Sequence, residues 1–193
     1  DDVDVVASHG MAPTEPDAAP FNAAVERIRG SILSDADKER QINGLLSRLA
    51  HESHVLGERT PACLSKLKAL GKPIFVTTHH AAHAASAYFA SGWDGGYVLT
   101  ADGWGEDASS TLWRAAGTSM ERFGLSYTFD SLGYFYGSIT KALGFIPHRH
   151  EGKVLGLAAY CPEPTSYPTI RAMIEYSAGE GRFVAHPENG IYL

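Results

Sequence analysis

The strongest constraint on the fold comes from residues 73–102, where an Ala-rich segment separates two short apolar runs. The runs at residues 73–78 and 96–102 are rich in β-branched and aromatic residues, which favour β-strands. We expect the first of these strands to be buried. Residues 79–91, HHAAHAASAYFAS, instead favour a helix that stops at Gly92. This succession of strand, helix and strand predicts an α/β protein.

The rest of the chain shows the same alternation. Residues 3–8 are a candidate strand, and a Pro-rich loop follows them. Apolar residues then recur at helical spacing over residues 35–70, with a break expected near residues 57–61. Further along we expect strands at residues 110–117 and 121–129 that complete an antiparallel meander, helices at residues 133–145 and 151–160, and a peripheral tail after residue 162.

Composition and charge narrow the class of protein. With 193 residues, of which 44% are hydrophobic and 20% are charged, the chain can bury one core. A net charge of −6 without a basic stripe argues against a nucleic-acid partner. No apolar run reaches the roughly 20 residues of a membrane span. Two cysteines without metal-like spacing fit a reducing cytoplasm.

His79 and His83 are the first candidate ligands. Four residues on a helix advance about 400°, so both rings would lie on one face, one turn apart. Two imidazoles can hold a divalent ion of the zinc or iron type, but they leave it short of ligands. A third ligand must then come from elsewhere in the protein. The alternative is a helix with one exposed and one core histidine.

The second motif, LTADGWGE, ends the strand at residues 96–102. Gly103 and Gly105 would let the backbone approach a ligand closely and present N–H groups to an anion. Asp102 and Glu106 could orient a metal-bound water or a substrate amine, which makes them the candidate catalytic residues. The alternative is an ordinary hairpin turn, because Asp-Gly is common in such turns.

A third cluster precedes the apolar helix expected at residues 151–160. Glu151 and Lys153 could contact phosphate or carbamoyl groups, and the preceding His148, Arg149 and His150 could steer an anion. The alternative is a solvated helix start in which the helix dipole favours Glu151 in the first turn.

Three segments in this order, residues 79–106, 131–145 and 151–160, resemble the O-carbamoyltransferase family of nodulation proteins and of cephamycin and tobramycin biosynthesis. The similarity is close over residues 73–160. It implies an actin-like, ribonuclease-H-like α/β fold with a mixed sheet and flanking helices, similar to the tRNA threonylcarbamoyl-transfer enzyme. It also implies that residues 1–193 are a single partial domain, without the second actin-like half and the adenylate-forming domain.

The resemblance implies a reaction and its substrates. ATP and carbamoyl phosphate would form a carbamoyl adenylate, and the carbamoyl group would pass to a hydroxyl of a sugar-containing acceptor, such as a nodulation lipo-oligosaccharide or an antibiotic. The expected partners are therefore this nucleotide, the carbamoyl donor, the acceptor and the remainder of a longer protein, with a homodimer as the assembly to test.

The family's functional positions can be transferred to this chain. Its metal-binding His-x-x-x-His falls on His79 and His83, with a third ligand expected from an aspartate of the second half. Its Asp-Gly-x-Gly-Glu turn falls on residues 102–106. The resemblance assigns nucleotide and phosphate contacts to Gly103, Gly105, Glu151 and Lys153. The sequence HRHEGK departs from the family's Ser-Gly-Glu-x-Lys before Glu151, although Glu151 and Lys153 are retained.

Two other classes of function remain open. A metal hydrolase could use His79, His83 and Asp102 as a three-residue site, and it would bind metal through this chain alone. A nucleotide-binding module without catalysis would keep the glycine turn and show no dependence on an acceptor.

Overall fold

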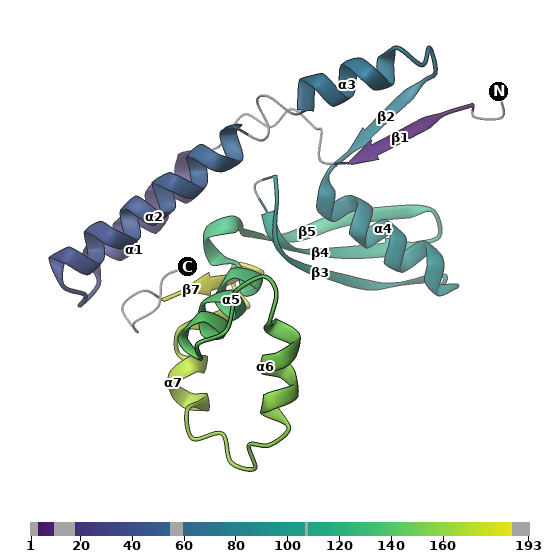
Figure 1. Ribbon diagram of the computed structural model, residues 1–193. Coiled ribbons are helices and arrows are strands. Elements are labelled where there is room, and N and C mark those ends of the chain that lie inside the picture. The colour runs from purple at the N-terminus through teal and green to yellow at the C-terminus, as the bar shows by residue number, and fades with distance from the viewer. Residues whose placement is uncertain (1–3, 10–17, 55–59, 107, 187–193) are drawn as a thin grey trace.

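The computed structural model describes residues 4–9, 18–54, 60–106 and 108–186 (Figure 1). The elements in chain order are β1 (Val6–His9), α1 (Ala18–Gly30), α2 (Asp35–His54), α3 (Thr60–Lys68), β2 (Ile74–Thr77), α4 (His79–Ser91), β3 (Gly95–Gly105), β4 (Ala108–Ala116), β5 (Ser119–Tyr127), the 3-10 helix η2 (Thr128–Asp130), α5 (Leu132–Ala142), α6 (Glu151–Ala158), α7 (Tyr167–Arg171), β6 (Ile174–Ser177) and β7 (Arg182–Ala185). The α/β class and the expected helices α4, α5 and α6 are confirmed. The expected break near residues 57–61 lies largely outside the described residues.

The described strands form three separate sheets instead of a single mixed one. β1 and β2 pair in parallel, β3, β4 and β5 form the expected antiparallel meander, and β6 and β7 form an antiparallel hairpin. The meander is continuous because short turns connect strands of similar length. The actin-like arrangement stays an expectation.

Helix α4 packs across one face of the meander (Figure 1). Its buried residues His80, Ala84 and Tyr88 repeat every four positions, so they form one stripe that faces the sheet. The side chain of Thr78 caps the helix by accepting a hydrogen bond from the N–H of Ala81 at 3.3 Å. Gly92, at a φ of 74°, ends it as predicted. The first turn of α4 is thereby fixed beside the end of β3.

A hydrophobic core lies between the helices α1 and α2 on one side and the 3-10 helix η2 on the other. It contains Ala24, Val25 and Ile28 of α1 and Leu45 of α2, which pack with Phe129 of η2. This packing secures the segment that leads from β5 into α5.

One expectation about burial was wrong, and a second holds only in part. β2 was expected to be buried, but Phe75 is 65% exposed and Val76 is 41% exposed, because among the described strands it pairs only with β1. The C-terminal tail is peripheral as expected as far as α7, which has no buried residue, but not in β6 and β7. The N–H of Ala185 in β7 donates to buried Asp130 at 2.9 Å.

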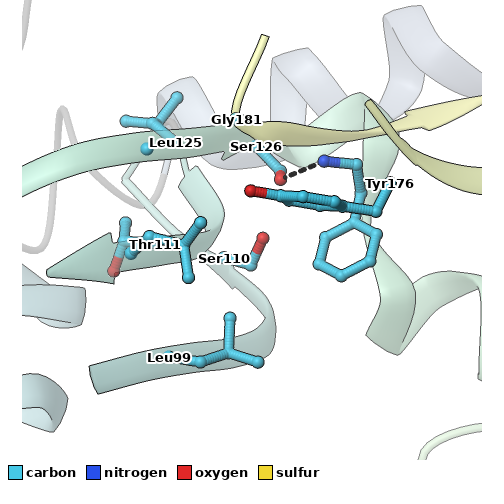
Figure 2. A pocket seen from close by; sticks show the side chains of 10 residues that line it. Leu99, Ser110, Thr111, Leu125, Ser126, Tyr176 and Gly181 are labelled. Carbon is cyan, nitrogen blue, oxygen red and sulfur yellow. Dashed lines mark hydrogen bonds between the residues drawn. The ribbon is translucent and has the colours of Figure 1, made fainter. Parts of the chain in front are cut away.

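The β6–β7 hairpin lies against the outer face of the meander, opposite α4. The Ser126 hydroxyl oxygen accepts a hydrogen bond from the N–H of Phe183 at 2.8 Å, drawn as the dashed line in Figure 2. A small pocket remains between the two sheets, and its lining includes Leu99, Ser110 and Tyr176. Tyr176 is the only titratable residue in this lining, so we interpret the pocket as a packing gap.

Among the described helices, none is both long enough and apolar enough to cross a membrane.

Candidate metal centre

The first turns of α4 and the end of β3 bring His79, His83 and Asp102 together. His79 Nε2 lies 2.9 Å from Asp102 Oδ2 and 2.9 Å from His83 Nε2. His83 Nε2 lies 3.4 Å from the same carboxylate oxygen. One ligand atom from each residue lies within 4.8 Å of the other two. The histidine spacing therefore places both rings on one face, and this chain itself supplies a carboxylate beside them. We call these three residues, as a candidate site, the metal centre.

The chemistry of the three donor atoms fits a divalent cation. His79 Nε2 is equally close to a carboxylate oxygen and to a second imidazole nitrogen, but a single N–H can point at only one of them. Three donor atoms this close together are instead what a cation requires. Two imidazoles with one carboxylate suit ions of the zinc or iron type and leave coordination positions open.

The Asp102 carboxylate is held in the orientation that a ligand needs. Its Oδ1 accepts a hydrogen bond from the N–H of Gly103 at 2.6 Å, which leaves Oδ2 directed at the histidines. Partial burial raises the pKa of Asp102, but hydrogen bonds from His79 and Gly103 outweigh it and lower the pKa overall. The side chains of Asp102 and His83 are 44% and 52% exposed, so a small molecule can reach the centre.

Glu106 and Gly105 pack against His79 from the turn. Glu106 is 6% exposed, and its two carboxylate oxygens accept the backbone N–H of His79 at 3.2 and 3.0 Å. Its negative charge therefore lies at the N-terminus of α4, where the helix dipole favours it. A Cβ on Gly105 would lie 2.4 Å from the His79 ring, so only glycine permits this approach. Glu106 itself has a φ of 57°, which is unusual for a residue with a side chain.

His80 is a residue whose importance the sequence did not reveal. It is 2% exposed and connects α4 to two strands. The carbonyl of Ala108 can only accept, so His80 Nε2 donates to it at 3.0 Å, and Nδ1 accepts from the Thr100 hydroxyl at 2.8 Å. Burial lowers the pKa of His80, which favours this neutral form. Thr100 and Thr111, polar residues within two apolar strands, were the available signal for a buried polar contact.

The cluster before α6, which we call the α6 cluster and define as residues 148–153, lies against α5. Glu151 accepts the N–H of His148 at 2.6 Å through a carboxylate oxygen, and Lys153 Nζ lies 3.1 Å from His150 Nε2. Burial raises the pKa of Glu151, but backbone hydrogen bonds, first that of His148, lower it overall. A Cβ on Gly137 of α5 would lie within 3.8 Å of both His148 and Glu151.

One face of α5 connects this cluster with the Asp102 turn. Gly133 and Gly137 are four residues apart, so they lie on the same side of the helix. A Cβ on Gly133 would lie 2.8 Å from the carbonyl oxygen of Asp102. The Asp102 turn and the α6 cluster thus both lie against α5, the first at Gly133 and the second at Gly137.

An α/β scaffold that directs two histidines and an aspartate at one point defines a candidate metal-dependent protein. The carbamoyltransferase N-terminus family matches residues 32–183, so the chain belongs to this family. This confirms the resemblance seen in the sequence.

Relatives with curated sequences agree with this assignment. The nodulation protein NolNO of Sinorhizobium fredii is 39% identical over 87 residues, which cover 45% of this chain and 13% of that protein. The nodulation protein NolO of Bradyrhizobium diazoefficiens is 32% identical over 108 residues, which cover 56% of this chain and 19% of that protein. An uncharacterized protein of Synechocystis is 39% identical over 88 residues, 46% of this chain and 14% of its own length. The match therefore spans less than a fifth of these relatives.

Proposed function

We propose that this chain forms part of an O-carbamoyltransferase that moves a carbamoyl group to a hydroxyl of a sugar-containing acceptor. The observation that carries the proposal is the convergence of His79, His83 and Asp102 in a member of the carbamoyltransferase N-terminus family. Carbamoyl phosphate and ATP would supply the group through a carbamoyl adenylate. The nodulation proteins among the relatives favour a lipo-oligosaccharide as the acceptor over an antibiotic.

His79, His83 and Asp102 would hold a divalent ion of the zinc or iron type. When bound, this ion would act as a Lewis acid that polarises a carbamoyl oxygen and neutralises phosphate charge. Asp102 is ionised and accessible, so it would also be the carboxylate best placed to orient the acceptor hydroxyl. Glu106 is the second candidate for that role, but it is 6% exposed and both its oxygens accept the His79 N–H, which favours a function in holding α4.

The nucleotide would contact the Asp102 turn and the α6 cluster. Lys153 is exposed and cationic, which suits a phosphate, and Glu151 lies beside it at the start of α6. Gly103 and Gly105 keep the turn free of side chains. Positioning of donor and acceptor is the main requirement of such a reaction, because an adenylate already carries a good leaving group.

One observation favours a second candidate, a metal hydrolase. Such an enzyme needs its ligands within one chain, and Asp102 satisfies this requirement where the sequence led us to expect an aspartate from elsewhere. In a hydrolase, water would replace the acceptor hydroxyl.

In the longer protein of which this chain would form part, radiolabelled carbamoyl phosphate, ATP and a lipo-oligosaccharide distinguish the two candidates. A carbamoyltransferase transfers label to the acceptor, and Asp102→Asn lowers the transfer rate. Release of label to water at a rate independent of the acceptor would support the hydrolase instead. An unchanged transfer rate in Asp102→Asn would exclude the role given to that carboxylate.

A further inference from the structure

Ser131 joins the Asp102 turn to helix α5. Its side chain is fully buried, and it is the N-cap of the helix. The hydroxyl oxygen accepts the N–H of Tyr134 at 3.1 Å and lies 2.7 Å from the carbonyl oxygen of Gly103. The carbonyl oxygen of Asp102 is more distant, at 3.2 Å. Because carbonyls only accept, the single hydroxyl proton donates to the turn, chiefly to Gly103.

Gly103 links Ser131 to the metal centre through two hydrogen bonds. Its carbonyl is held by Ser131, and its N–H donates to Asp102 Oδ1 at 2.6 Å. The orientation of this one residue therefore sets the rotation of the Asp102 carboxylate. With Oδ1 engaged, Oδ2 is the oxygen that faces His79 at 2.9 Å.

Ser131 cannot move freely to follow a displaced turn. Its neighbour Asp130 is 2% exposed and accepts hydrogen bonds from Arg27 at 2.9 Å and from Arg182 at 3.0 Å. On the other side, a Cβ on Gly133 would lie 2.8 Å from backbone atoms of the turn, so α5 and the turn are already in contact. The contacts of Asp130 and Gly133 therefore fix the position of the Ser131 hydroxyl.

We propose that Ser131 is a positioning residue of the metal centre, which acts through Gly103 to direct the Asp102 carboxylate at His79 and His83. The inference rests on the proposed function, because occupation of the centre by a metal is part of that proposal. Hydrogen-bond partners of metal ligands typically change metal affinity by about 10- to 100-fold when they are removed. Ser131 touches neither the ion nor a substrate, so its effect should appear in the geometry and affinity of the site.

The test is a Co²⁺ titration of the full chain followed by visible absorption, which reports both affinity and ligand geometry. Because Ser131 acts through Gly103, we expect Ser131→Ala and Ser131→Gly to bind Co²⁺ about 10-fold more weakly, the lower end of the range for direct partners, and to give altered band intensities. Glycine costs a helix cap only a little, so Ser131→Gly provides a folded variant if Ser131→Ala does not fold. Ser131→Thr keeps the hydroxyl and should restore wild-type binding.

Ser34→Ala is the matched control. Ser34 accepts the N–H of Asp37 at 3.2 Å near the start of α2, so this variant also loses a helix-capping bond, but its Co²⁺ affinity should not change. Wild-type binding that persists unaltered in folded Ser131→Ala or Ser131→Gly would overturn the role of Ser131 and leave the proposed function standing. Wild-type protein that binds no Co²⁺ would overturn the assignment of His79, His83 and Asp102 as a metal centre, and with it the role of Ser131.

Discussion

The metal centre and the α6 cluster differ in how firmly the chain itself holds their side chains. At the metal centre, His79 is fixed through its backbone by Glu106 and is contacted on its ring by Gly105. The adjacent His80 is 2% exposed and anchors the same turn of α4 to the meander. His79 therefore rests on residues that are buried within the described part of the chain, and the N–H of Gly103 holds the Asp102 carboxylate.

The α6 cluster has much weaker support. Val154 is the one buried residue of α6, whereas Leu155 and Leu157 on the same helix are 69% and 49% exposed. Lys153 is exposed as well. A short helix with so little burial gains little stability from packing.

This difference separates two kinds of binding. A site held by buried contacts is preorganised, so it should bind its ion with the geometry already present. A site on a loosely packed helix should gain its geometry only when a ligand or another part of the protein covers it. We therefore expect substitutions at the metal centre to act strongly on affinity, and those at the α6 cluster to act weakly on both affinity for metal and stability.

The largest effect is expected from removing both histidines. His79→Ala combined with His83→Ala takes away two of the three ligands, so the loss of metal affinity should exceed the roughly 100-fold seen when only a partner of a ligand is lost. Isothermal titration with Zn²⁺ measures it. Lys153→Ala is the control in the α6 cluster and should bind Zn²⁺ like the wild type. Equal binding by the double variant would show that the ion lies elsewhere.

Two glycines provide the next comparison. Gly105→Ala would place a Cβ 2.4 Å from the His79 ring, so we expect a loss of about 1–3 kcal/mol in unfolding free energy together with weaker Zn²⁺ binding. Gly152→Ala in α6 meets nothing within 4 Å and should stabilise the protein by roughly 0.5–1 kcal/mol, as alanine does in helices. Chemical denaturation and titration of both variants measure these effects. Stability that fell equally in both would contradict the comparison.

Substitution of His80 tests the packing that supports the metal centre without removing one of its ligands. His80→Ala leaves the Thr100 hydroxyl and the Ala108 carbonyl without this partner in a buried site, so unfolding should become easier by about 1–3 kcal/mol. His83→Ala removes a side chain that is 52% exposed and should leave the apo protein within about 0.5 kcal/mol of the wild type. Urea denaturation of the two metal-free variants measures the difference in their unfolding free energies. A His80→Ala variant that is more stable than His83→Ala would refute the anchoring role of His80.

Local sequence signals were sufficient for the parts of the site that depend on local structure. Thr78, the alanine-rich run and Gly92 define where α4 begins and ends, and that helix places His79 and His83 on one face. The position of Asp102 relative to the histidines was not accessible in this way, because it depends on how α4 packs across β3. For the same reason the sequence offered Asp102 as a ligand only within an alternative function.

The sequence could not show features whose environment is set by distant segments. Glu106 stays a candidate catalytic residue, and the structure adds that its carboxylate caps a helix that starts 27 residues earlier. Phe75 read as buried because its strand is apolar, but β2 has only β1 as a neighbour among the described strands. The hairpin β6–β7 read as peripheral because its acceptors, Ser126 and Asp130, lie more than 50 residues away in sequence.

The smallest effect is expected at Glu151, and it has a defined pH dependence. The pKa of Glu151 is lowered in the folded protein, so its stabilising contribution is present above the ordinary range of a glutamate and is lost as the pH falls through the lowered value. Glu151→Gln should therefore reduce the melting temperature slightly at pH 7, and the two proteins should converge once the pH has fallen below the lowered pKa of Glu151. A melting difference that stayed constant between these pH values would mean that packing, and not charge, holds the start of α6. In that case packing would support the α6 cluster, as it supports the metal centre.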